Sequence, residues 1–301
     1  MVDVFIGSIS FEERCSSAIR SMDRRFNLGF VFCSEEVAHY RDQHISFFLE
    51  RIESVKEHAT SYQGSINNLR AFQTVVAELG QLINSEGGVN IYWDITTFRR
   101  ENIALLLLAF KKLSVGTIIN VVYADAFDYS VNEEGANKWL SKGVTKVGTV
   151  VGYGGFFAAN KPFRLVIFLG IEEERIKALI ERTEPSDVLF LLPKTSNDRL
   201  DIVRLHIFER VMPGCAYDLQ KMTHNDPEKT ASELLELAKD QSHNYGICSF
   251  NSKRSALGFA LAALRNQNLR LFYVWAEAYN KQGYSSGSGV VSIQQITVGL
   301  N

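Results

Sequence analysis

The first half of the chain alternates short apolar runs with longer amphipathic segments. The apolar runs are rich in branched and aromatic residues and predict strands, whereas the 3–4 spacing of apolar positions between them predicts helices. A pair of polar strands, resembling a hairpin, is expected around 137–152. The predicted strands are "DVFIGSI" (3–9), "FVFCS" (30–34), "VNIYWDI" (89–95) and "GTIINVVYADA" (116–126), and the predicted helices cover 11–26, 38–58, 65–84 and 101–113.

The second half shows the same alternation. Because its strands are continuous apolar runs separated by helices, they predict a mainly parallel sheet covered on both faces, which is a Rossmann-like α/β arrangement. The strands are "RLVIFLG" (164–170), "DVLFLLP" (187–193), "CAYDL" (215–219), "NYGICSF" (244–250) and "LRLFYVWAEA" (269–278), with helices at 172–182, 198–210, 227–240 and 253–265.

The two halves also resemble each other in sequence. "VFIGSISFEER" (4–14) is echoed by "VIFLGIEEER" (166–175), and "VVYADAFDYS" (121–130) by "YVWAEAYNKQGYS" (273–285). Two further echoes follow in the same order, and the offset is far longer than a solenoid repeat. The sequence therefore predicts two tandem Rossmann-like units, residues 1–160 and 161–301, with the boundary near "AANKPF".

Ligands of parallel sheets bind where the loops leave the carboxyl ends of the strands. The loop "DITTFRR" follows a predicted strand and places Asp94, two threonines and two arginines before a helix. Hydroxyls, guanidinium groups and the free N–H groups of a helix start suit a phosphate or carboxylate. Alternatively, Thr96 or Thr97 is the N-cap of that helix and no ligand is involved.

Three other loops carry polar residues at matching places. In the first, Ser8 and Ser10 follow Gly7, and Arg14 could pair with a phosphate or with Asp94; "EER" at 12–14 is otherwise ordinary complementation of the helix dipole. In the loop "ADAFDYS" (124–130), which follows the fourth predicted strand, Asp125 could hold a ribose hydroxyl or accept a hydrogen bond from Arg100 or from loop amides. The loop of the second half that matches "DITTFRR" keeps Asn251, Ser252, Lys253 and Arg254, with Cys248 in place of Asp94.

Composition narrows the choice of function. The formal net charge of −2 gives no global field that would attract bulk nucleic acid or an anionic membrane. Four separate cysteines and six histidines without ligand spacing predict neither a disulfide framework nor a metal site. No phosphate-binding P-loop or nucleophile elbow is found. Without a signal-like N-terminus or a long apolar run, the chain is expected to be cytoplasmic.

The loop "DITTFRR" resembles the pattern found in CRISPR-associated Rossmann fold (CARF) sensors and in their fused two-copy relatives, the SAVED domains. An acid, a hydroxyl residue two positions on and a basic residue four further correspond to Asp94, Thr96 and Arg100. The resemblance implies binding of a cyclic oligonucleotide second messenger between two Rossmann units, within a prokaryotic antiviral defence system. Cys248 and Phe250 depart from the pattern, so the resemblance implies an asymmetric site.

Three functions are compatible with these observations. The leading hypothesis is a non-catalytic nucleotide sensor or adaptor, without cofactor, that acts on a separate effector protein. The alternatives are an enzyme acting on nucleotides or nucleosides, of the glycosidase or transferase type, and a structural subunit whose loops bind protein. The residues expected to contact a ligand are Gly7, Ser8, Ser10, Arg14, Asp94, Thr96, Thr97, Arg99, Arg100, Asp125, Asn251, Ser252, Lys253 and Arg254.

Overall fold

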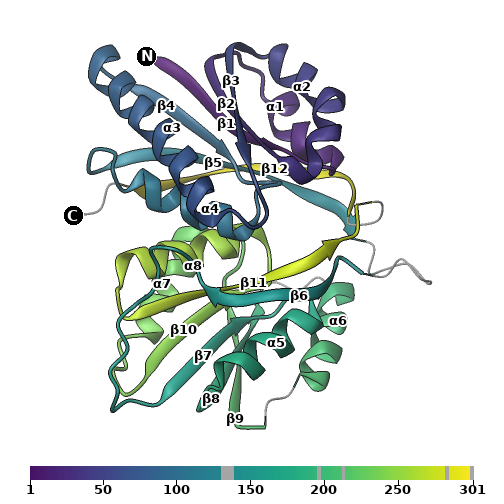
Figure 1. The fold of residues 1–301 in the computed structure, drawn as a ribbon, viewed down its shortest axis with the longest axis vertical. Coiled ribbons are helices and arrows are strands. Elements are labelled where there is room, and N and C mark those ends of the chain that lie inside the picture. Colours follow the sequence, from purple (N-terminus) through teal and green to yellow (C-terminus); the bar gives the residue numbers. More distant parts are fainter. Residues whose placement is uncertain (130–138, 195–197, 212–213, 282–284, 299–301) are drawn as a thin grey trace. The chain divides into compact units, whose positions relative to one another are not determined.

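The computed structural model describes residues 1–129, 139–194, 198–211, 214–281 and 285–298. These residues form two six-stranded sheets, each mostly parallel and each interleaved with helices (Figure 1). The predicted α/β class, with two Rossmann-like units and mainly parallel sheets, is confirmed. The two compact units comprise Met1–Tyr129 with Tyr284–Asn301, and Ser130–Gly283.

The first unit contains a sheet with the strand order β12-β5-β4-β1-β2-β3. Only β12 is antiparallel to its neighbour. The strands are β1 (Val2–Ile9), β2 (Phe26–Ser34), β3 (Ile52–Thr60), β4 (Val89–Asp94), β5 (Thr117–Tyr129) and β12 (Ser285–Val298), and the helices are η1 (Glu13–Ser16), α1 (Ser17–Ser21), η2 (Glu35–Tyr40), α2 (Arg41–Leu49), α3 (Ser65–Glu86) and α4 (Arg100–Phe110).

The second unit repeats this order as β6-β11-β10-β7-β8-β9, again with one antiparallel edge strand, β6. Its strands are β6 (Ser141–Thr149), β7 (Phe163–Phe168), β8 (Asp187–Pro193), β9 (Ala216–Met222), β10 (Asn244–Ser249) and β11 (Leu269–Tyr279), and its helices are α5 (Glu173–Thr183), α6 (Asp198–Arg210), α7 (Pro227–Leu237) and α8 (Lys253–Arg265).

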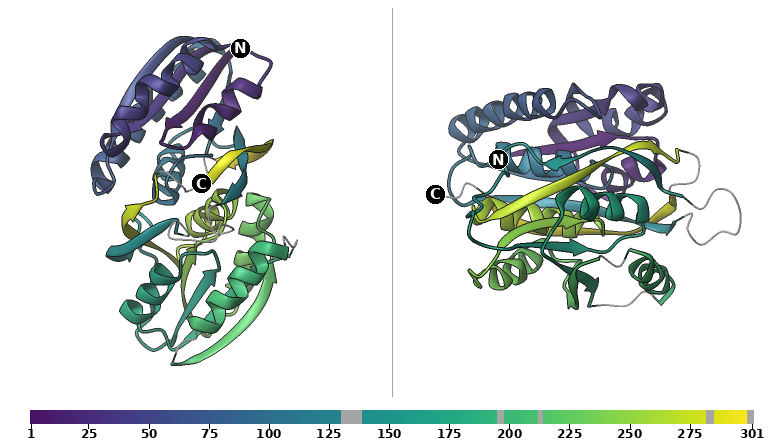
Figure 2. Two further views of the ribbon diagram at one scale, coloured as in Figure 1. Left: turned by 90° about the vertical axis from the view of Figure 1, so that its right-hand side faces the viewer. Right: turned by 60° about the horizontal axis from the view of Figure 1, so that its bottom comes forward.

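The antiparallel edge strands are exchanged between the two halves of the sequence. Strand β6 lies in the first half but pairs with β11, and β12 ends the second half but pairs with β5 (Figure 2). The expected hairpin around 137–152 is therefore wrong, because β6 finds its partner more than a hundred residues further along the chain. For the same reason the compact units differ from the predicted division at residue 160.

One predicted helix is also partly wrong. Residues 38–58 were expected to be helical, but the helix α2 ends at Leu49 and β3 begins at Ile52. In β3 Glu53, Ser54, Lys56 and Glu57 are charged or polar and exposed, because this strand is the edge of the sheet. Charged side chains on an edge oppose pairing with other chains, and they hide the alternation by which a strand is recognised.

Each sheet is covered on one face by the helices that follow its first two strands. In the first unit, Ala18 and Ile19 of α1 and Phe48 of α2 pack with Phe5 of β1. In the second unit, Ile176 and Leu179 of α5 occupy the corresponding core. The opposite face of the first sheet is covered by α3 and α4, which pack side by side. The sheets consequently expose their strand ends and loops, where the candidate site lies.

Candidate functional site

The order of the strands defines a switch point in each sheet. From β1 the chain continues outward to β2 and β3, then returns to β4 and β5 on the other side. The crevice between β1 and β4 is therefore the place where ligands of such sheets bind. In the second unit the equivalent crevice lies between β7 and β10. The two loops that sequence singled out in each half thus meet at one switch point in each unit.

Asp94 and Thr96 form a buried hydrogen-bonded turn at the end of β4. The carboxylate of Asp94 accepts from the backbone N–H of Thr96 at 2.9 Å and from its hydroxyl. The Thr96 hydroxyl oxygen in turn accepts from the N–H of Ala124 on β5 at 2.9 Å. Both side chains are 2% exposed or less. In this structure they fix the loop to the neighbouring strand, and they do not face solvent.

A side chain spans the crevice of each unit. The Thr97 hydroxyl donates to the carbonyl oxygen of Ser8 at 2.8 Å, and the amide of Asn251 donates to that of Leu169 at the same distance. The two residues occupy matching positions in the repeated loops. These bonds tie the loop after the fourth parallel strand to the end of the first, so that the crevice has a fixed width.

The helix-cap interpretation holds for one unit only. Arg99 occupies the N-cap position of α4 and makes no side-chain cap, so neither threonine caps that helix. The guanidinium of Arg99 donates to the carbonyl oxygens of Ser61 and Tyr62 at 2.5 and 2.7 Å and lies over the Tyr62 ring. In the second unit Ser252 does cap α8, since its hydroxyl oxygen accepts from the N–H of Ser255 at 3.2 Å.

The small residues at the start of the first loop have local roles. Gly7 lies inside β1 and not in the loop; a Cβ there would lie 2.7 Å from the Phe5 ring and 3.2 Å from the Phe48 ring. The backbone at Gly7 therefore closely approaches the core and not a ligand. Ser8 is half-buried, and its hydroxyl makes only a weak bond of 3.4 Å to the carbonyl oxygen of Ile9. Ser10 is buried and accepts from the N–H of Glu12.

Arg14 pairs with Glu12 at 2.8 Å, and both side chains are almost fully buried. Its guanidinium also donates to the carbonyl oxygen of Ala124 at 3.0 Å. Arg175 repeats this arrangement by pairing with Glu172 and donating to the carbonyl oxygen of Val274. Arg14 and Arg175 thus clamp the first loop to the fifth parallel strand in both units.

The basic residues of the two helix starts lie at the rim of the switch points. Arg100 is the first residue of α4, and Lys253 and Arg254 are the first two of α8; all three are half-buried. Asp125 is half-buried near the middle of β5, next to the loop that Arg14 clamps. These four residues remain candidates for contact with a ligand.

Sequence reasoning missed two residues beside α8. The Ser252 hydroxyl donates to the carbonyl oxygen of His224 at 3.1 Å, which brings the loop after β9 to the helix start. Burial, followed by the charges of Arg204 and Arg254, lowers the pKa of His224 to about 4. Arg204 is buried on α6 and pairs with Asp201 at 2.7 Å. His224 and Arg204 are far in the sequence from the loop at 248–254. Only the fold brings them close to Ser252 and Arg254.

Burial raises the pKa of Asp94 to about 7, against the opposing effects of the two Thr96 bonds and of Arg14. A folded-state pKa above the ordinary value of 3.8 means that the folded chain holds the proton more tightly than the unfolded chain. The stabilisation is complete below the ordinary pKa and is lost as pH rises through about 7.

We therefore expect Asp94→Asn, which keeps the shape and carries no charge, to become relatively more stable as pH rises. The free energy of unfolding of the variant minus that of wild type should increase by roughly 2 kcal/mol between pH 5 and pH 8. Urea unfolding at the two pH values measures this difference. The exposed Asp218, changed to asparagine, is the control, and an equal pH dependence in both variants would contradict the assignment.

Two other features bear on the chemistry. Among the described residues, no group of three or more histidine, cysteine or acidic side chains could hold a metal ion. No helix in the described part of the chain combines the length and apolarity that a membrane span requires.

Comparisons with known proteins were made on sequence and on structure. No protein-family model and no curated protein matches the sequence. Among solved structures, a universal stress protein from Archaeoglobus fulgidus DSM 4304 is similar at 8% identity, 89% coverage of this chain, 94% of its own and a TM-score of 0.25. The ketoreductase from the first module of phoslactomycin biosynthesis in Streptomyces sp. HK803 is similar at 9% identity. The match covers 83% of this chain and 57% of the ketoreductase chain, with a TM-score of 0.23. The chain thus spans little more than half of that ketoreductase chain, and neither similarity bears on function.

Proposed function

We propose that this protein is a non-catalytic nucleotide sensor or adaptor that binds a nucleotide, in particular a cyclic oligonucleotide, and acts on a separate effector protein in antiviral defence. The observation that carries the proposal is the position of Arg100, Lys253 and Arg254. All three lie in the first turn of a helix at a switch point. The defence context rests on the resemblance of "DITTFRR" to CARF and SAVED sensors.

The placement of these basic residues opposes the helix dipole. The N-terminus of a helix carries a partial positive charge, so a cation in the first turn costs about 0.3–1 kcal/mol. An anionic ligand reverses the sign of that contribution and also accepts from the N–H groups of the first turn. A phosphodiester fits this environment, because it offers a single negative charge and several acceptor oxygens.

The second unit places two further polar groups, His224 and Arg204, near Arg254. His224 stays neutral at physiological pH because it is buried near Arg204 and Arg254. A neutral imidazole there can donate or accept a hydrogen bond, as a base edge or ribose hydroxyl requires. Asp201 offsets part of the charge of Arg204. The arrangement favours an anion of low charge density, such as a phosphodiester, over a small multivalent ion.

The loops around these residues are held by internal bonds. The bonds from Thr97 to Ser8 and from Asn251 to Leu169 fix each crevice, and Thr96 fixes the end of β4 to β5. A ligand that binds at such a rim has little backbone to order, so more of the interaction energy appears as affinity. This supports a binding role for the rim even though most of the polar loop residues face inward.

Calorimetry with a panel of mononucleotides and cyclic di-, tri- and tetranucleotides tests the proposal. We expect saturable binding of at least one cyclic nucleotide and a 10- to 100-fold loss of affinity in Arg254→Ala and in Arg100→Ala, as removal of a charged hydrogen bond costs about 1.5–3 kcal/mol. Arg25→Ala, at an exposed site beside the amino end of β2 and not among the carboxyl ends of the strands, should bind as wild type does. No binding across the panel, or an equal loss in Arg25→Ala, would refute the proposal.

One observation favours a second function, an enzyme acting on nucleotides or nucleosides. Asp94 is a buried carboxyl group at a switch point with a pKa of about 7, and a carboxyl group tuned in this way can serve as a general base. Incubation with NAD and nucleotides, followed by mass spectrometry, distinguishes the two functions. A product that forms with wild type but not with Asp94→Asn would establish the enzyme and displace the sensor.

A further inference from the structure

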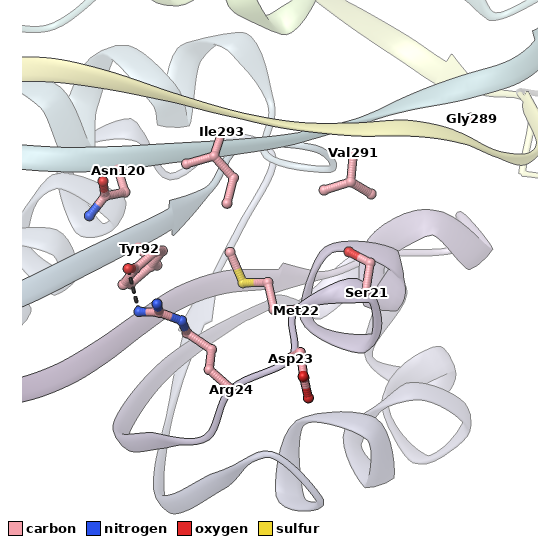
Figure 3. Close-up of a pocket in the computed structure, with 9 residues that line it drawn as sticks. All are labelled: Ser21, Met22, Asp23, Arg24, Tyr92, Asn120, Gly289, Val291 and Ile293. Carbon is pink, nitrogen blue, oxygen red and sulfur yellow. Dashed lines mark hydrogen bonds between the residues drawn. The ribbon is translucent and has the colours of Figure 1, made fainter.

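The first unit has an open groove on the face that carries α1, near the amino ends of β4 and β5. Its volume is about 700 Å³, and none of the residues that line it belongs to the candidate site (Figure 3). Met22, Tyr92, Val291 and Ile293 form its apolar surface. The full lining consists of Ser21, Met22, Asp23, Arg24, Tyr92, Asn120, Gly289, Val291 and Ile293.

In the second unit, aromatic rings cover the corresponding face of the sheet. The strand registers, aligned at Asp94 and Cys248, place Phe163, Gly246 and Arg270 where the first unit has Asp3, Tyr92 and Asn120, and they place Phe272 where the first unit has Val122. The rings of Phe163 and Phe272 lie 6.2 Å apart over Gly246, where a Cβ would be only 2.7 Å from each ring. Both rings pack against the core of that unit.

A third ring completes this cover. Phe157, from the segment before β7, lies 5.3 Å from Phe163, and the Arg270 guanidinium stacks on its other side at 3.7 Å. The Arg270 guanidinium also donates to the carbonyl oxygen of Gly154 at 2.5 Å. A polypeptide segment of the sequence "GGFF" therefore covers this face of the second sheet.

The first unit has Asp3 in place of Phe163 and Asn120 in place of Arg270, and it leaves apolar surface uncovered. The Arg24 guanidinium lies over the Tyr92 ring at 4.5 Å, donates to the Tyr92 hydroxyl and reaches Asp3 at 3.4 Å (Figure 3). The Asn120 amide donates to the carbonyl oxygen of Ile91. Ile293 on β12 remains 51% exposed. Large apolar side chains in a groove are typical of a surface that another polypeptide covers.

The rim of the groove is basic. The segment "RSMDRR" at 20–25 carries three arginines and one aspartate, and all four side chains are exposed. Arg24 and Asp23 line the groove directly. The excess positive charge favours an occupant with acidic residues beside its apolar anchor.

We propose that this groove binds a segment of a partner protein that inserts a large aromatic side chain and carries acidic residues on either side. The aromatic ring would lie between Met22, Tyr92 and Ile293, as Phe157 lies against Phe163 in the second unit. The flanking carboxylates would meet Arg24 and Arg25. Aromatic anchors of this kind contribute most of the energy of many interfaces, and this groove is independent of the proposed nucleotide site.

The test uses the full chain and a fluorescein-labelled peptide, EDGFFED, in fluorescence anisotropy. We expect saturable binding with a dissociation constant on the order of 100 µM, which is weak because the peptide is short and unordered. The charge-reversed peptide KRGFFKR and the alanine peptide EDGAAED should each bind at least tenfold more weakly. No saturable change at about 1 mM EDGFFED, or equal binding of the three peptides, would overturn the proposal.

A matched pair of variants locates the site. Ile293→Glu should weaken EDGFFED binding at least tenfold, whereas Ile118→Glu should leave it within twofold, since Ile118 is equally exposed at 51% but does not line the groove. Thermal unfolding by circular dichroism confirms that both variants fold. Equal effects of the two variants would overturn the assignment. Sedimentation measures whether the chain forms a dimer. If it does, and if Ile293→Glu dissociates that dimer, then a second copy of the chain occupies the groove, and the proposal of a partner segment is overturned.

Discussion

Replacing Arg175 with methionine should lower the free energy of unfolding by about 3–5 kcal/mol, the usual cost of removing one partner of a buried ion pair. Arg175 and Glu172 are each 2% exposed and form a direct ion pair. The variant leaves the Glu172 carboxylate buried, with the Ser141 hydroxyl at 3.2 Å as one remaining donor. It also removes the bond to the carbonyl oxygen of Val274, which holds the first loop against β11. Equilibrium urea unfolding measures the loss.

The double variant Glu172→Gln with Arg175→Met separates the ion pair from the rest of the site. Because the uncompensated charge is then absent, we expect it to recover at least half of the lost stability. Arg210 provides a surface comparison: it pairs with Glu173 at 2.9 Å but is 59% exposed, and Arg210→Met should cost less than about 1 kcal/mol. A double variant as unstable as Arg175→Met alone would show that the charge is not the cause.

The fold class could be predicted from the sequence because both of its signals are local. Apolar runs of strand length, separated by helices, identify a parallel sheet, and the echo between the two halves identifies the duplication. The exchange of β6 and β12 is not a local property. Each strand is polar on its exposed side and could pair with any open edge, so its own residues do not specify the partner. Strand β3 was missed because its charged residues protect an edge and resemble the polar face of a helix.

The meeting of the two candidate loops could be predicted from the sequence, but the directions of their side chains could not. Residues after β1 and β4 meet because the strand order creates a switch point there, and alternation of strands and helices already indicated this. The direction of each side chain depends on tertiary contacts. Thr96 turns inward because the N–H of Ala124 on a neighbouring strand needs an acceptor, and Arg99 turns toward the carbonyl oxygens of Ser61 and Tyr62. These partners lie 28 to 38 residues away, beyond any motif.

The retained "EER" segments show which part of such a loop is architectural. Arg14 and Arg175 each reach across the sheet to a carbonyl oxygen of the fifth parallel strand, and each is neutralised by a nearby glutamate. The bond requires a long, always charged donor, which explains why arginine stands in both copies. The serines of the first loop have no counterpart in this clamp.

The substitution Gly170→Ala should have the other large effect, a loss of more than about 3 kcal/mol in the free energy of unfolding. A Cβ at this position would lie 1.9 Å from the carbonyl oxygen of Phe250 and 2.6 Å from its carbonyl carbon. Both atoms belong to the backbone, so no rotamer change can relieve the overlap. The Phe250 segment cannot move away easily, because its N–H donates to Phe168 and Asn251 donates to Leu169.

The matched control is Gly80→Ala. Gly80 lies in the interior of α3, where a Cβ would meet nothing within 4 Å, and alanine there should stabilise the protein by about 0.5–1 kcal/mol. We therefore expect the same substitution to change the free energy of unfolding in opposite directions at the two positions. Urea unfolding of both variants measures these changes. Relief of the overlap at Gly170 requires the crevice between β7 and β10 to widen, which displaces the start of α8 with Lys253 and Arg254. Unchanged stability in Gly170→Ala would show that this crevice is compliant, and that the internal bonds across it do not fix the rim for a ligand.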